Sequence, residues 1–185
     1  MQRGLARGSV PAIAVLLVAL LFAGCEKVPE PEGPDDSLLI GAIMLEARGY
    51  KETANMRIDG EHYRNITLTF SNAITGEEYE LKTREAGLFW SNKIPAGNYY
   101  IKRYAFVLET DSHKYTLHGT LTGKLTLPVR PGRVTNLGAI LWYSDAENEV
   151  YQFRQAKTPE QFRDELQKEF PESAWHQREW ISVKI

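Results

Sequence analysis

Residues 83–101 read TREAGLFWSNKIPAGNYYI, and this stretch decides the fold that we expect. Gly87 and Gly97 can adopt the backbone dihedrals that tight turns need, and Pro95 fixes one such dihedral in advance. The apolar residues of the stretch, which can point into a shared core, are Phe89, Ile94, Tyr99 and Ile101. The stretch therefore predicts a β-hairpin at the centre of a strand-rich domain, with Gly97 at a positive φ.

Short strand-like runs flank this stretch, and turn residues separate them about every eight to twelve positions. The clearest alternation places Ile66, Leu68 and Phe70 on one face. The expected strands are residues 37–46, 64–71, 78–83, 88–91, 98–109, 114–121, 124–129 and 133–143. This spacing is typical of a sandwich or a barrel. We expect an all-β fold, a seven- to eight-stranded antiparallel β-sandwich, over residues 37–143.

The hydrophobic period changes towards the C-terminus. Residues 158–161 read TPEQ, a helix start with a capping threonine, a proline at the first helical position and a glutamine that completes a capping box. Phe162, Leu166 and Phe170 then recur every four residues, which predicts an amphipathic α-helix that the next proline ends. We expect residues 144–185 to form a C-terminal helical extension packed on the sandwich; a partner-binding helix is the alternative.

The opening stretch also resembles a known family, the carboxypeptidase-regulatory-like domains, which are transthyretin-like (prealbumin-like) β-sandwiches. It matches the central hairpin of that family through Gly87-Leu-Phe89 and through residues 94–99, IPAGNY, in place of Leu-Pro-Pro-Gly-x-Tyr. Arg84 and Ala96 depart from the family pattern. The resemblance implies a prealbumin-like topology and an accessory, stabilising or binding role. It implies no catalytic residue, because the family shares none.

The N-terminus has the layout of a secretory signal. Arg3 and Arg7 precede an apolar run over residues 10–23. As a helix this run would cover about 21 Å, less than the roughly 30 Å hydrocarbon core of a bilayer. We therefore expect residues 1–24 to be a signal peptide, with a membrane-spanning or buried helix as the alternative.

The end of this run, Phe22-Ala-Gly-Cys25, resembles the lipobox of bacterial lipoproteins. The resemblance implies that Cys25 becomes the acylated N-terminus and that the membrane is a partner through this lipid. Glu26, rather than aspartate, follows the cysteine, which favours the outer membrane. Residues 25–36 are rich in proline and acids, so we expect them to form a tether that holds the domain a short way off the bilayer.

The composition excludes several classes of protein. The 185 residues carry 22 Lys and Arg against 24 Asp and Glu, a net charge of −2, so the chain lacks the excess of basic residues of a nucleic-acid-binding protein. Hydrophobic residues make up 43%, enough for a core. The single cysteine excludes a disulfide scaffold and a metal site built from several cysteines.

No catalytic motif stands out in the sequence. There is no Gly-x-Ser-x-Gly elbow, phosphate loop or dinucleotide fingerprint. His113 and His118 lie five apart on one expected strand, and therefore face opposite ways. His176 and Glu179 have a zinc-ligand spacing but no downstream histidine to complete three ligands. The adjacent acids at 77–78 point apart in an extended chain. We expect no enzyme activity, no metal and no cofactor.

Two hypotheses of function remain. The first is a lipid-anchored protein of the bacterial cell envelope that acts as a non-catalytic structural or interaction module, and binds an envelope protein or glycan through an edge strand or the C-terminal helix. The alternative is a carbohydrate- or small-ligand-binding lipoprotein that uses exposed aromatics. The candidate rings are Trp90, Tyr100, Tyr104, Trp142, Tyr143, Trp175 and Trp180. A row of exposed rings would favour the alternative.

Overall fold

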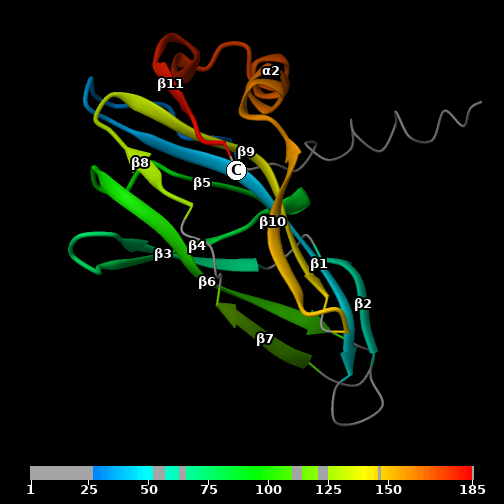
Figure 1. The fold of residues 1–185 in the computed structure, drawn as a ribbon. Coiled ribbons are helices and arrows are strands. Elements are labelled where there is room, and N and C mark those ends of the chain that lie inside the picture. Colours follow the sequence, from blue (N-terminus) through cyan, green and yellow to red (C-terminus); the bar gives the residue numbers. More distant parts are fainter. Residues whose placement is uncertain are drawn as a thin grey trace, which may run out of the picture.

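Two β-sheets pack face to face in the computed structural model (Figure 1). It describes residues 27–51, 57–62, 66–109, 114–120, 125–145 and 147–184. Sheet A contains β1 (Leu38–Lys51), β2 (Arg57–His62), β5 (Leu88–Ser91), β9 (Arg133–Asp145), β10 (Val150–Lys157) and β11 (Glu179–Ser182). Sheet B contains β3 (Ile66–Asn72), β4 (Glu78–Lys82), β6 (Gly97–Glu109), β7 (Lys114–Thr120) and β8 (Leu127–Val129). The prediction of an all-β sandwich is confirmed.

The strand order shows where the expected architecture needs correction. Sheet A runs β10-β9-β1-β2, with β11 also paired to β9 and β5 to β1; sheet B runs β4-β3-β6-β7, with β8 paired to β6. The β1–β9 and β9–β11 pairs are parallel, so sheet A is mixed and the prediction of a purely antiparallel sandwich is wrong. All eight predicted strands are present. The described residues contain three more, β2, β10 and β11.

The stretch over residues 83–101 does not form a hairpin. Its first strand, β5, pairs with β1 in sheet A, whereas its second strand, β6, pairs with β3, β7 and β8 in sheet B. The intervening residues therefore cross from one sheet to the other. The apolar side chains of the stretch are nevertheless buried as expected; they are Phe89, Ile94, Tyr99 and Ile101.

The two glycines of this stretch serve different purposes. Gly87 ends the short 3₁₀ helix η1 (Glu85–Gly87) with a φ of 71°, and a Cβ at this position would overlap the carbonyl oxygen of Ile43. Gly97 is not among the residues of positive φ, so that expectation is wrong. A Cβ there would instead lie 2.8 Å from Nδ2 of Asn72. Close packing, rather than backbone dihedrals, favours glycine at this position.

Two hydrophobic clusters lie on the two faces of sheet A. The larger one fills the space between the sheets, with Phe70, Ile101 and Ile140 among its buried members. The smaller one lies on the other face, beneath the helix α2 (Pro159–Glu169), where Phe162 and Leu166 are buried. Figure 1 shows α2 and β11 close together at one end of sheet A, at the top of the view.

The helix α2 begins and packs as the sequence predicts. The Thr158 side chain accepts a hydrogen bond from the backbone N–H of Gln161, and the Gln161 side chain accepts one from the backbone N–H of Thr158, which completes the capping box. Phe162 and Leu166 are 6% and 4% exposed, and Phe170 packs against the same cluster. The predicted amphipathic face therefore contacts sheet A and belongs to the domain.

The boundary expected at residue 143 lies inside the fold. Strand β9 continues to Asp145, and both β10 and β11 pair with it. Residues 144–185 therefore complete sheet A as well as supplying α2. Strand β10, which covers residues 150–157, carries polar side chains on both faces, so its sequence pattern does not predict a strand.

The segment before β1 is docked on the domain. Val28 is 8% exposed and belongs to the cluster beneath α2. The Trp175 indole N–H donates a hydrogen bond to the carbonyl of Pro29 at 2.6 Å, and the Arg178 guanidinium donates to the carbonyls of Gly33 and Pro34. Proline lacks an N–H but keeps its carbonyl as an acceptor, so a proline-rich segment can be held by donors on another element.

This docking corrects the prediction of a free tether over residues 25–36. Its described part, from Lys27 onwards, lies beside the C-terminal residues 173–178 (Figure 1). The predicted signal peptide, residues 1–24, and the residues Cys25 and Glu26 lie outside the described part of the chain.

Candidate functional site

The outer face of sheet B carries a hollow whose lining residues are mostly polar in type, although most of the surface exposed inside it is apolar. Helix α2 and the docked N-terminal segment pack on sheet A, to which β11 also belongs. Within the described ranges no helix covers the outer face of sheet B (Figure 1). The hollow has a volume of about 460 Å³. We call it the sheet B hollow, and its lining residues are Thr67, Thr69, Glu80, Arg103, Tyr104, Ala105 and His118.

Strand alternation and register bring these side chains together. On β3, Ile66 and Leu68 are buried in the core, so Thr67 and its i+2 neighbour point to the other face. Thr67 pairs with Ala105 of β6, which in turn pairs with His118 of β7. One row across three strands therefore forms the floor of the hollow. The alternation of β3 predicts its core face from the sequence, but nothing in the sequence marks its polar face as a site.

A charged network borders the hollow. The Arg103 guanidinium donates hydrogen bonds to Oγ1 of Thr69 at 3.1 Å and to Oε2 of Glu78 at 2.9 Å, while Lys102 donates to Oε1 of Glu78 at 2.6 Å. The hydrogen bond from Lys102 lowers the pKa of the Glu78 carboxyl, and the positive charge of Arg103 lowers it further. The Glu78 carboxylate is thus bound by two cations.

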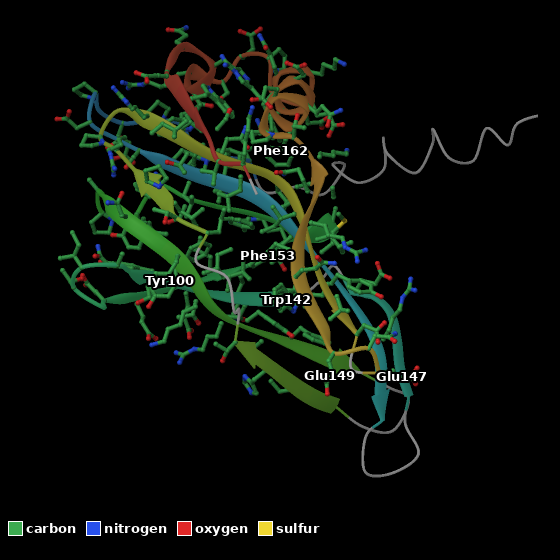
Figure 2. The ribbon with its side chains drawn as sticks, in the orientation of Figure 1. Tyr100, Trp142, Glu147, Glu149, Phe153 and Phe162 are labelled. Atoms are coloured by element: carbon green, nitrogen blue, oxygen red, sulfur yellow. The ribbon has the colours of Figure 1, made fainter. Side chains whose placement is uncertain are left out.

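The candidate aromatic residues do not form an exposed row. Trp90, Trp142, Tyr143 and Trp175 are buried, and the other three rings, Tyr100, Tyr104 and Trp180, are half-buried. Arg84 lies over the Trp90 ring at 3.5 Å, and the rings of Trp142 and Phe153 meet edge to face with centroids 4.8 Å apart (Figure 2). Most of these aromatics therefore have roles inside the fold.

The zinc-like spacing of His176 and Glu179 does not bring the two side chains together. His176 lies in the 3₁₀ helix η2 (Ala174–Gln177), where its Nε2 is 2.7 Å from the carbonyl oxygen of Phe170. Glu179 forms an ion pair with Arg133 at 3.1 Å. No group of three or more His, Cys, Asp or Glu in the described ranges is placed to hold a metal. His118 is exposed on β7, and His113 lies outside the described residues.

The lipidation site predicted at Cys25 lies outside the described residues, three positions before the docked Val28. No helix in the described part of the chain is long and apolar enough to cross a bilayer.

The described residues form an all-β sandwich with one sheet face that no described helix covers, and comparison with known proteins adds little to this class. No family model matches the sequence, and no curated protein matches it. Two solved structures show a weak likeness, each at 15% identity and a TM-score of 0.32. One is a leucine-rich repeat protein from Bacteroides thetaiotaomicron VPI-5482, where the match covers 61% of this chain and 14% of that chain. The other is a candidate carbohydrate-binding protein from Pseudomonas aeruginosa, with 68% and 95% covered. Likenesses at this level carry no argument about fold or activity.

Proposed function

We propose that this chain is a lipid-anchored protein of the bacterial cell envelope and acts as a non-catalytic interaction module through the outer face of sheet B. The observation that carries the proposal is the arrangement of the two layers: α2 covers sheet A, while the sheet B hollow is open and bordered by charged side chains. The apolar face of α2 packs inside the domain and is not exposed to a partner, because Phe162 and Leu166 are buried there. Sheet B is therefore a better contact surface than the helix.

The anchor in this proposal is a lipid on Cys25, and the membrane is the outer membrane. Its support is the lipobox-like end of residues 1–24 and the use of the chain's single cysteine at this junction. The finer fold proposed for the domain is the prealbumin-like sandwich of carboxypeptidase-regulatory-like modules. The burial of Phe89 and Tyr99, two residues that carry the resemblance, is consistent with it.

The contact surface is tested with a substitution inside the hollow. Ala105→Arg places a long cation on the floor of the hollow, at an outward position between Thr67 and His118. Gln167→Arg adds the same side chain to the exposed face of α2 and serves as the control. After cross-linking in intact cells, we expect the wild type and the control to give the same cross-linked species and Ala105→Arg to lose it. Retention of that species in Ala105→Arg would contradict the proposal.

A second candidate is glycan binding in the same hollow. The hollow presents the polar side chains of Glu80 and Arg103, which are groups that hydrogen-bond sugar hydroxyls, whereas the Tyr104 ring packs against the core beside Trp142. Titration calorimetry with envelope oligosaccharides tests this candidate. Saturable heat that Ala105→Arg abolishes would favour glycan binding over a protein partner.

A further inference from the structure

The chain that leaves Cys25 is fixed to one end of the domain after a very short distance. Val28 is 8% exposed and packs in the cluster with Leu166 and Trp175, and the carbonyl of Pro29 accepts the Trp175 indole N–H at 2.6 Å. Glu30 accepts a hydrogen bond from the backbone N–H of Ala174 at 2.8 Å. Residues 28–30 are therefore part of the folded body.

Covalent geometry limits how far this end can lie from an acylated cysteine. Three residue steps separate Cys25 from Val28, and a fully extended chain spans at most about 3.6 Å per step, so their Cα atoms lie within about 11 Å of each other. A twelve-residue tether, as the sequence predicts for residues 25–36, would reach roughly 40 Å by the same geometry. The docking removes most of that freedom.

The opposite end of sheet A is the turn between β9 and β10. Eleven steps along β9 separate Val134, in the cluster near the docked segment, from Asp145 beside the turn, a distance of at most about 36 Å at strand geometry. Figure 2 shows Phe162 of α2 and the turn residues Glu147 and Glu149 at opposite ends of the molecule. Both glutamates are exposed.

We propose that the end of the domain formed by residues 27–34, the C-terminal end of α2 and η2 lies against the surface of the lipid bilayer, with the β9–β10 turn pointing away from it. This inference rests on the proposed acylation of Cys25. The short link then fixes the orientation of the domain on the membrane. In this orientation the outer face of sheet B is turned sideways and away from the lipid.

Energy transfer to the membrane tests this orientation on the acylated full chain. In acylated protein the thiol of Cys25 is blocked, so an introduced cysteine is the one site for a maleimide dye. Glu172→Cys lies next to Ser173 at the proposed membrane end, and Glu147→Cys lies at the far turn; both replace an exposed glutamate. The protein is bound to phosphatidylcholine vesicles that carry a small fraction of acceptor-labelled lipid. We expect transfer from position 172 to exceed transfer from position 147 several-fold.

A variant in which residues 27–34 are held less firmly on the domain provides the control. Val28→Ser with Arg178→Gln removes the buried side chain and the two hydrogen bonds to the carbonyls of Gly33 and Pro34. We expect the difference between the two dye positions to shrink in this background. An undiminished difference, or equal transfer from both positions in the docked protein, would overturn the orientation.

Dye uptake by the protein without an introduced cysteine tests the acylation of Cys25 separately from the orientation. Protein without an introduced cysteine should take up no dye; uptake of one dye per chain would refute acylation of Cys25 and the orientation with it. No uptake combined with equal transfer would refute the orientation alone.

Discussion

Gly87 and Gly76 have nearly the same backbone but different surroundings. Their φ angles are 71° and 74°, in the left-handed region that disfavours a Cβ. A Cβ at Gly87 would overlap the Ile43 carbonyl, whereas a Cβ at Gly76 would meet nothing within 4 Å. We expect Gly76→Ala to cost about 1 kcal/mol and Gly87→Ala to cost at least about 3 kcal/mol, since β1 must move. Urea denaturation measures both costs; equal midpoints would refute the placement of η1 against β1.

Glu78 should titrate below an ordinary glutamate, whose pKa is about 4.3. The Lys102 hydrogen bond favours the ionised carboxyl and so lowers its pKa in the folded state. The resulting stabilisation is present above the ordinary pKa and is lost as the pH falls through the lower, folded-state value. We expect Lys102→Met to raise the pKa of Glu78, as measured by NMR of the side-chain carboxyl.

The matched control for this titration is Lys168→Met, which removes an equivalent charge from α2, on the other sheet. This substitution should leave the titration of Glu78 unchanged. A Glu78 midpoint that moves equally in both variants would show that net charge, rather than the hydrogen bond, sets the pKa.

The helix α2 depends on its contact with sheet A. It has 11 residues, too few to persist alone in water, so the burial of its apolar face supplies most of its order. We expect Phe162→Ala to destabilise the domain by about 3–5 kcal/mol and the exposed Gln167→Ala to change stability by less than about 0.5 kcal/mol. A chain that stops after Thr158 should aggregate or melt much lower. A monomeric truncated protein with an unchanged melting temperature would make α2 a separate arm.

Local patterns predicted those elements whose periodicity reflects burial on one or both faces. The eight predicted strands and the capped helix are of this kind. Strand β10 was missed because its outward residues Gln152 and Arg154 and its inward residue Gln155 are all polar; the Gln155 amide donates to the carbonyl of Leu137 rather than packing in an apolar core.

The pairing of strands could not be predicted from local patterns. The stretch over residues 83–101 contains correct turn and core residues, but the same residues suit a hairpin and a crossover between sheets. Which of the two forms depends on β1, which pairs with β5 from a distant part of the chain. Local patterns could not predict the candidate site for the same reason, because Thr67, Ala105 and His118 become neighbours only through the register of three strands.

The proposed acylation of Cys25 predicts that the protein is found at a membrane. Cells are grown with a clickable fatty-acid analogue, and the wild type is compared with Cys25→Ala. We expect label and membrane association in the wild type and neither in the variant, because the sequence has no second cysteine. The Glu172→Cys variant, which keeps Cys25, controls for the effect of a surface substitution. Equal labelling of the wild type and Cys25→Ala would refute the anchor.

The parallel pairing of β1 with β9 has a consequence for how the chain is made. Leu38 pairs with Val134 and Arg48 with Asp145, so the partners are roughly a hundred residues apart, a separation that slows folding. The ribosome synthesises β1 long before β9. The strand edge of the apolar residues 38–45 that pairs with β9 therefore stays unpaired during this interval. Such an edge attracts other unfolded chains. Sheet A therefore cannot close before β9 and β11 have been synthesised, and until then the open edge of β1 can pair with other copies of the chain.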